Sequence, residues 1–257
     1  GSRIAYVTKR GPDPDRHSNW DIYLMEPRAG AAERQLTSFM GADASPDWES
    51  RPAWSPDGGQ IAYVRGGDDR DIYYATWQLY VIDVATGTSR ITADIDRGFT
   101  RPRFTPNGRS VLALVERSRT THLSRIELTS GRVTPLTAGP RFDVEFAVAA
   151  DGRVAVLGGD DAHPHRLQAV EKKGLRTIAD HNEWVAQRQL APVEPVSFPS
   201  VDSKIIDGFL VRPVGHEAGR DPYFQHLYKA NLDGGDVTLL SPEDANHAFK
   251  LSPDGAH

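Results

Sequence analysis

The chain has 257 residues, which allows one large domain or two small ones. Lys and Arg number 30 against 35 Asp and Glu, and this net charge of −5 argues against nucleic acid as the main partner, because phosphate binding needs a concentrated positive field. No stretch approaches the roughly 18 apolar residues of a membrane-spanning helix, so we expect no membrane partner. The absence of cysteine excludes disulfides, thiolate nucleophiles and cysteine-based metal sites.

The sequence near the two ends shows no recognisable targeting signal. No apolar segment of a signal peptide follows the N-terminus, and residues 1–2, Gly-Ser, are typical of the scar left when a tag is cleaved. We therefore assign no localisation. The 23 Gly and 18 Pro residues, with only 2 Met, indicate an all-β chain rich in tight turns.

A short motif recurs along the chain, in which an apolar run is followed by Asp or Asn and usually Gly, and then by a second apolar run. Its copies, of which the fourth is the weakest, lie at residues 52–64, 102–114, 146–157, 196–206 and 249–255. The Asp or Asn positions are 57, 107, 151, 202 and 254, so the steps are 50, 44, 51 and 52 residues. A steady period of this size, with several short strands per unit, is typical of a β-propeller.

The motif predicts a hairpin between the two innermost strands of a blade. Asp-Gly or Asn-Gly supplies the positive φ angles of such a tight turn. Segments such as 21–25, 78–83, 123–128 and 226–232 predict a third strand, and 89–92 or 236–240 an outermost strand. A single four-stranded blade cannot bury both of its faces, so the blades must stack in a ring.

The two ends complement each other. The C-terminus stops after the turn at residues 252–255, and residues 3–8 at the N-terminus have the sequence of the strand that should follow this turn. Pairing of the two would close the ring without a covalent bond and remove exposed sheet edges. We predict an all-β, single domain over residues 1–257: a five-bladed β-propeller with four-stranded blades, closed by the C-terminal strand pairing with the N-terminal blade.

These residues resemble a known family. The Ser-Pro-Asp-Gly and Ile-Ala-Tyr unit is similar to the propeller of prolyl-oligopeptidase-like (S9) serine peptidases, with repeats shared by TolB-type propellers. Residues 192–214 resemble the lead-in from propeller to α/β-hydrolase domain in acylaminoacyl-peptidase-like members, whereas residues 219–245 resemble the propeller of dipeptidyl-peptidase-IV-like members. That order is reversed relative to the family, so the chain resembles a chimera of fragments of about 1–216 and 217–257, joined near residues 215–217.

The catalytic motif that the resemblance would imply is missing. No Gly-x-Ser-x-Gly sequence occurs in the 257 residues, and no triad can be carried over. The sequence therefore argues against a serine peptidase activity of this chain.

Histidines and carboxylates gather on one predicted face of the propeller, where the loops between second and third strands meet the connectors between blades. Imidazole suits Zn²⁺ or another transition metal, and carboxylates suit Ca²⁺. We predict His181, His247, Asp143 and Glu49 as ligands of a divalent metal, with Zn²⁺ or another transition metal as first choice and Ca²⁺ as second. Polar loops also collect His and Asp by composition alone, and both alternatives stay open.

Two further segments have alternative interpretations. Asp160 to His165 contains a His-x-His pair that could hold a metal, although its position favours a solvated hairpin tip. Tyr73, Tyr74 and Trp77 either pack in the core or form an apolar wall at the channel mouth.

Two functions follow from these observations. The first is a peptidase-derived propeller without the serine hydrolase domain, acting as a scaffold that binds a small-molecule ligand or a metal. The alternative is a metal-dependent hydrolase of activated esters or phosphoesters, like a phosphotriesterase, in which a metal-activated water lies at the channel mouth. Exchange of strand 247–252 between copies would give a strand-swapped or other homo-oligomer.

Overall fold

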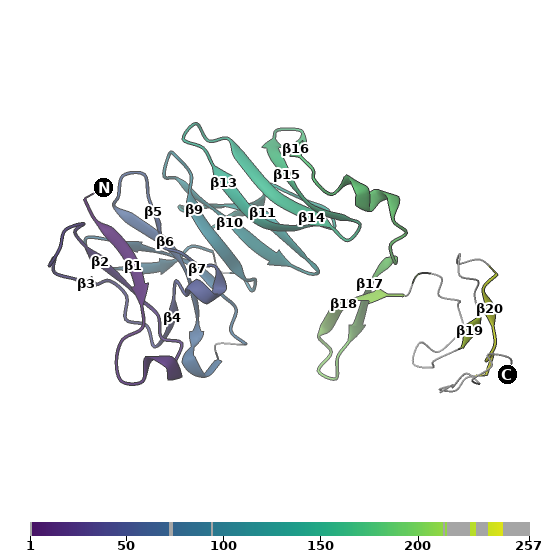
Figure 1. Cartoon of the computed structure of the whole chain (residues 1–257). Helices are drawn as coiled ribbons and strands as arrows, with labels where there is room; N and C mark the ends of the chain where they lie inside the picture. The colour runs from purple at the N-terminus through teal and green to yellow at the C-terminus, as the bar shows by residue number, and fades with distance from the viewer. Residues whose placement is uncertain are drawn as a thin grey trace. The chain divides into compact units, whose positions relative to one another are not determined.

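The computed structural model describes residues 2–71, 74–93, 95–212, 214, 227–229 and 236–243 (Figure 1). Within these residues strands predominate and the helices are short 3₁₀ segments, so the predicted all-β class is confirmed. The chain divides into two compact units, Gly1–Gln189 with Pro195–Phe209, and Leu190–Glu194 with Leu210–His257. Among the described residues, no helix has the length and apolar character needed to cross a membrane.

The first sheet is a three-stranded antiparallel meander. Strands β1 (Ile4–Thr8), β2 (Asp21–Met25) and β3 (Arg34–Gln35) lie side by side in chain order. Tyr6 stands opposite Tyr23 and their rings stack with centroids 5.9 Å apart. This sheet lacks, among the described residues, the innermost strand that a four-stranded blade requires.

Three antiparallel meanders follow, each built like the predicted blade. The first contains β4 (Gly41–Asp43), β5 (Ala53–Trp54), β6 (Gln60–Asp68), β7 (Gln78–Asp83) and β8 (Ser89–Ile91), with β4 and β5 both paired to β6. The second contains β9 (Phe99–Phe104), β10 (Ser110–Arg117), β11 (Thr120–Glu127) and β12 (Val133–Pro135). The third contains β13 (Phe142–Val148), β14 (Val154–Asp160), β15 (His163–Glu171) and β16 (Gly174–Ala179). One parallel pairing, Thr121 with Phe142, joins the last two meanders (Figure 1).

The remaining elements are two hairpins and the 3₁₀ helices. The hairpins pair β17 (Val193–Pro199) with β18 (Ile205–Val211), and β19 (Tyr228–Lys229) with β20 (Thr238–Leu239). The 3₁₀ helices are Pro14–Arg16, Pro46–Trp48, Asp69–Asp71 and Glu183–Gln187.

The recurring motif forms a tight turn in each described copy. The left-handed residue at its end is Gly58 (φ 72°), Gly108 (φ 69°) or Gly152 (φ 86°), and in the fourth copy it is Ser203 (φ 64°). The preceding Asp or Asn does not take a positive φ, which corrects the expectation that both residues would do so. Its side chain instead accepts a backbone N–H two residues further on, for example Gly59 to Asp57 at 3.0 Å.

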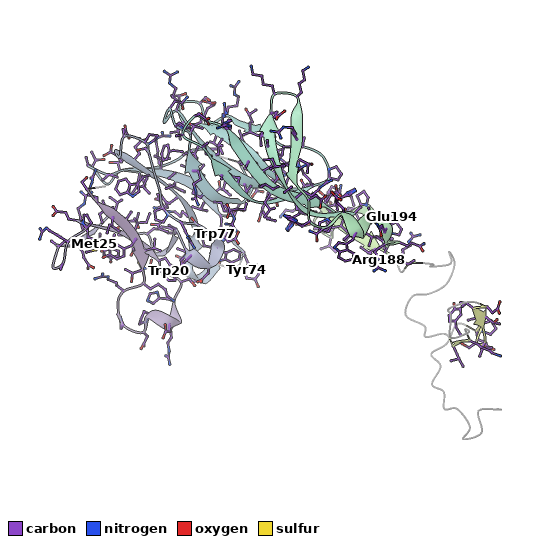
Figure 2. All side chains as sticks on the ribbon, turned by 45° about the horizontal axis from the view of Figure 1, so that its top comes forward. Trp20, Met25, Tyr74, Trp77, Arg188 and Glu194 are labelled. Atoms are coloured by element: carbon purple, nitrogen blue, oxygen red, sulfur yellow. The ribbon has the colours of Figure 1, made fainter. Side chains whose placement is uncertain are left out.

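Apolar side chains fill the space between successive meanders of the first unit (Figure 2). Alternate residues of a strand point to opposite faces, so β6 serves two cores. Ile61 and Tyr63 pack with Ile22 and the first sheet, whereas Ala62 and Val64 pack with β9 to β11. This face-to-face stacking of meanders in chain order is the packing that the ring prediction requires.

A hydrogen bond of the outer two strands recurs in both units. The backbone N–H of a residue in or next to the third strand donates to a hydroxyl that follows the fourth strand. The three pairs are Ile22 with Thr37 at 2.9 Å, Leu123 with Thr137 at 3.1 Å and Leu227 with Ser241 at 2.7 Å. The β19–β20 hairpin of the second unit therefore has the local geometry of the outer half of a blade.

The predicted third strands at 21–25 and 78–83 coincide with β2 and β7. The closing strand 247–252 and the fragment junction near 215–217 lie outside the described residues. The number of five blades, the closure of the ring, the single domain and the chimera stay predictions.

Candidate functional site

Arg101 links three successive blades through two ion pairs. Its Nη2 lies 2.6 Å from Oε1 of Glu49, and its Nη1 pairs with Glu145. Arg101 (φ 54°) lies where the β9–β10 register shifts, and Glu49 (φ 54°) ends the 3₁₀ helix before β5. This left-handed conformation costs a non-glycine residue about 1–3 kcal/mol, so surrounding contacts must hold it. The carboxylate of Glu49, a predicted metal ligand, is engaged by this guanidinium.

Asp143, another predicted metal ligand, is buried in β13 with both oxygens occupied. Its Oδ1 accepts a hydrogen bond from Nε of Arg141 at 2.8 Å and lies 2.7 Å from Nη2 of the same guanidinium. Its Oδ2 accepts the backbone N–H of Leu123 at 2.9 Å and the hydroxyl of Thr137. The carboxylate therefore fastens β11 of one blade to β13 of the next.

A second buried carboxylate has the same position in an earlier blade. Asp43 follows Thr37 by six residues, as Asp143 follows Thr137. Its side chain has no exposed area and accepts Nε of Arg65 at 2.7 Å. Burial raises the pKa of Asp43, while the hydrogen bond from Arg65 opposes that rise. The recurrence of this arrangement points to a structural role for Asp143.

Aromatic rings surround the partner of Asp43. The guanidinium carbon of Arg65 lies 4.3 Å from the ring centroid of Tyr80 and 4.7 Å from that of Phe39, and Nη2 donates to the hydroxyl of Tyr63 at 2.9 Å. Cation–π contacts of this kind strengthen when the cation is desolvated. The cluster joins the connector after β3 to the second blade.

The predicted ligand His181 lies in a different place from Glu49 and Asp143. Together with His165 it lines a hollow of about 410 Å³ on the sheet of β13 to β16. Glu145 also lines this hollow, and most of the other lining residues, such as Ala155 and Leu157, are apolar. Nearby, His163 at the tip of the β14–β15 hairpin is bonded through Nδ1 to Asp160 at 2.8 Å. The structure thus brings one predicted ligand together with one of the histidines of the His-x-His pair.

The predicted metal set is not assembled within the part of the chain that the structure describes. His247 lies outside the described residues. Among those that are described, no three or more His, Asp or Glu side chains are grouped so as to hold a metal ion. The predicted metal stays a prediction, with His181 as the described candidate that no ion pair engages.

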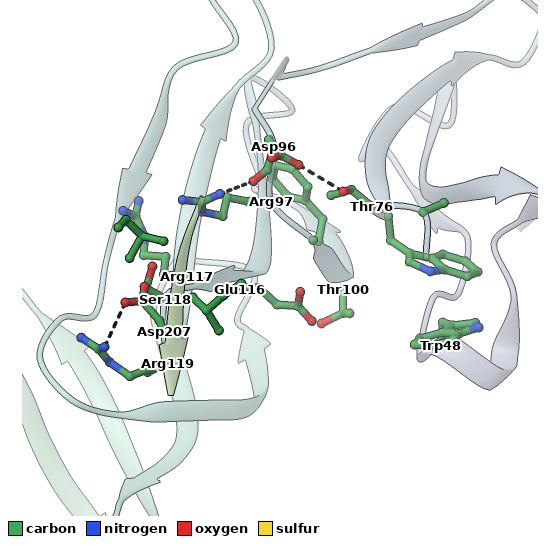
Figure 3. A pocket seen from close by; sticks show the side chains of 16 residues that line it. Trp48, Thr76, Asp96, Arg97, Thr100, Glu116, Arg117, Ser118, Arg119 and Asp207 are labelled. Carbon is green, nitrogen blue, oxygen red and sulfur yellow. Dashed lines mark hydrogen bonds and ion pairs between the residues drawn. The ribbon is translucent and has the colours of Figure 1, made fainter. Parts of the chain in front are cut away.

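A hollow of about 690 Å³ lies among the connections β6–β7, β8–β9 and β10–β11 and part of β18; we call it the loop-side hollow (Figure 3). Its aromatic wall is the stacked pair Trp48 and Trp77, with ring centroids 5.0 Å apart. Trp77 is buried and supports Trp48, which is 39% exposed. Tyr74 is 91% exposed (Figure 2), and Tyr73 lies outside the described residues, so of the predicted aromatic group Trp77 alone is shown at this wall.

Charged side chains line the rest of the loop-side hollow. Arg119 donates to Asp207 at 3.1 Å. The hydroxyl of Ser197, which donates to Asp207 at 2.6 Å, holds the pKa of that carboxyl below its usual value. Glu116 forms no ion pair with any described residue, and Figure 3 shows its carboxylate pointing toward Thr100. The hollow therefore combines an aromatic surface with a carboxylate that forms no ion pair, and it also contains Arg97 and Arg117, which form no ion pair with a described carboxylate either.

The sequence reasoning missed Trp48, Glu116 and Arg101. A signal for Trp48 existed, because residues 45–48 repeat the first three residues of the turn motif with Trp in place of Gly. Without glycine the chain forms a 3₁₀ turn and Glu49 takes the left-handed position. No comparable local signal marks Glu116 or Arg101, since their roles depend on neighbours from other blades.

Sequence comparisons find relatives for part of the chain. It is 31% identical over 116 residues to the uncharacterized peptidase YuxL of Bacillus subtilis, covering 45% of this chain and 16% of YuxL. It is 37% identical over 93 residues to the Tol-Pal system protein TolB of Polaromonas naphthalenivorans, covering 36% of this chain and 17% of TolB. The chain thus spans about a sixth of the length of each. No family model matches the chain.

Solved structures show the same fold. The acylaminoacyl peptidase of Pyrococcus horikoshii matches with a TM-score of 0.65 at 19% identity, covering 86% of this chain and 32% of the peptidase. The β-propeller domain of the Trilobed protease from Pyrococcus furiosus matches with a TM-score of 0.52 at 16% identity, covering 71% and 53%. The fold is therefore of the β-propeller type found in S9 peptidases and TolB proteins, as the sequence predicted.

Proposed function

We propose that this chain is a ligand-binding propeller scaffold of five four-stranded blades and that its loop-side hollow takes an organic cation with an aromatic or apolar body. The observation that carries the proposal is the Trp48–Trp77 stack in the same hollow as Glu116, whose carboxylate forms no ion pair with any described residue. Indole faces attract cations, and a carboxylate without a partner completes such a site.

Closure of the ring is part of the proposal. Strands β1 and β2 have the register of β6 and β7: Tyr6 faces Tyr23 as Tyr63 faces Tyr80, and both pairs of rings lie in contact. The first sheet thus corresponds to a blade that lacks its inner strand within the described part of the chain. Residues 251–255 repeat the turn sequence that follows inner strands, which supports their assignment to this place.

The binding proposal is tested with 2-phenylethylamine and its neutral isostere 2-phenylethanol, by isothermal titration calorimetry. We expect the amine to bind more tightly, and Glu116→Gln to weaken amine binding about tenfold, because a desolvated cation–carboxylate or cation–π contact is worth about 1–2 kcal/mol. Trp48→Ala should weaken both ligands.

Glu127→Gln is the matched control, since it makes the same charge change at the far end of β11. It should leave both affinities unchanged. Equal binding of amine and alcohol, or an amine affinity that neither Glu116→Gln nor Trp48→Ala changes, would overturn the proposal.

A metal-dependent hydrolase is the second candidate, favoured by the shared hollow of His165 and His181. The carboxylate of Glu145 also lines this hollow but pairs with Arg101, and no three described ligating side chains are grouped there, so we derive no reaction step from them. Elemental analysis of tag-free protein before and after chelation, with ester and phosphotriester hydrolysis measured on the same samples, tests it. Stoichiometric Zn²⁺ or Ca²⁺ that is lost from His181→Ala would favour this candidate. Protein without metal and without chelator-sensitive activity would exclude it.

A further inference from the structure

A third hollow lies near the turns at the opposite end of β9 from the loop-side hollow. It measures about 1060 Å³ and we call it the turn-side hollow. Phe99 and Thr100 of β9 line the loop-side hollow, whereas Arg103 and Phe104 line the turn-side hollow. The two are therefore separate places on the inner strands, and neither depends on a ligand in the other.

The turn-side hollow has an excess of positive charge. Arg51 and Arg103 both line it, and neither forms an ion pair with a described carboxylate. Arg103 donates to the carbonyl of Pro102 at 2.9 Å, which leaves its charge uncompensated. The carboxylate of Glu145 also lines the hollow, but it pairs with Arg101.

The excess of positive charge follows from which residues occupy one position of the repeat. Arg51, Arg101 and Glu145 occupy the same position, three residues before the end of the inner strand in successive blades. Arg101 forms an ion pair with Glu145 of the next blade and a second ion pair with Glu49, which lies two residues before Arg51. Arg51 is thus left without the carboxylate nearest to it in sequence.

The walls favour a strong interaction with an anion. Pro52, Trp54, Phe104 and Pro106 line the same hollow as Arg51 and Arg103 and give it rigid, apolar walls. Such walls lower the local dielectric constant, and the planar fork of arginine matches the geometry of carboxylate and phosphate oxygens. We propose that the turn-side hollow binds an anionic group, a carboxylate or a phosphate, through Arg51 and Arg103.

The test uses the full chain and calorimetric titrations of inorganic phosphate and of citrate at low ionic strength. We expect saturable binding of at least one, weakened tenfold or more in the double variant Arg51→Gln/Arg103→Gln. Binding of phosphate alone would assign a phosphate ligand, and binding of citrate alone a carboxylate ligand. Arg103→Lys keeps the charge but loses the bidentate fork, so an intermediate loss would support direct contact.

The matched control is Arg90→Gln/Arg125→Gln, which removes two exposed arginines from β8 and β11. If this control weakens binding as much as the double variant does, or if neither anion binds saturably, the proposal is overturned. Circular dichroism of each variant separates loss of the site from loss of the fold.

Discussion

Replacing Arg65 with methionine is expected to lower the free energy of unfolding by about 3–5 kcal/mol, because it leaves the carboxylate of Asp43 buried without its partner. The double variant Arg65→Met/Asp43→Asn removes both charges and should be more stable than the single variant by about 1 kcal/mol or more. Urea denaturation followed by tryptophan fluorescence measures both differences.

Arg70 provides a matched control for this prediction. It pairs with Asp68 at 3.0 Å, but its side chain is 84% exposed. Breaking an exposed pair costs less than about 1 kcal/mol, so Arg70→Met should be nearly neutral. If Arg65→Met lowers the free energy of unfolding as little as Arg70→Met does, the aromatic cluster around Arg65 does not hold the first two blades together.

Replacing Asp143 with alanine should also cost about 3–5 kcal/mol. The change leaves Arg141, whose side chain is 11% exposed, without a carboxylate, and removes one of the two acceptors of the Leu123 N–H. Glu171→Ala, which breaks the exposed pair with Arg176, is the control and should cost less than about 1 kcal/mol. Thermal and urea unfolding measure the cost.

The same variant separates the two interpretations of Asp143. A purely structural carboxylate makes Asp143→Ala unstable at any metal concentration. A variant that keeps wild-type stability but loses a bound metal would contradict the structural role and restore Asp143 as a ligand.

Much of the fold could be predicted because its signals are local. The Asp-Gly turns specify where an inner hairpin reverses, and an unbroken apolar run such as Ile61 to Val64 specifies a strand with two buried faces. These signals need only a few neighbouring residues, so the strands β2 and β7 were predicted at their observed bounds.

The site was less predictable because it depends on contacts between blades. The residue types and their predicted face of the propeller placed Glu49 and Asp143 among possible metal ligands. The sequence could not show that Arg101 and Arg141 form ion pairs with them. Residue spacing did contain one unused signal. Thr37 to Asp43, Thr137 to Asp143 and Ser241 to His247 are all separated by six residues, so His247 occupies the sequence register of two buried structural carboxylates.

The most direct test of this account is a disulfide across the proposed closure. The chain has no cysteine, so an introduced pair reports on one contact alone. In the second blade Trp54 faces Ile61, and aligning the turn motifs and the Ile-Ala-Tyr-Val segments places Leu251 opposite Ile4. The test pair is Ile4→Cys with Leu251→Cys, and the control pair is Ile4→Cys with Lys250→Cys, whose side chains would point to opposite faces.

Mass spectrometry of the oxidised, native protein should find the Ile4→Cys/Leu251→Cys disulfide within a single chain, and little or none in the control pair. A disulfide that links two chains would show that the C-terminal strand pairs with a neighbouring chain, that is, strand exchange in place of closure within one chain. Absence of the disulfide, or equal cross-linking of both pairs, would contradict a ring closed by the C-terminal strand.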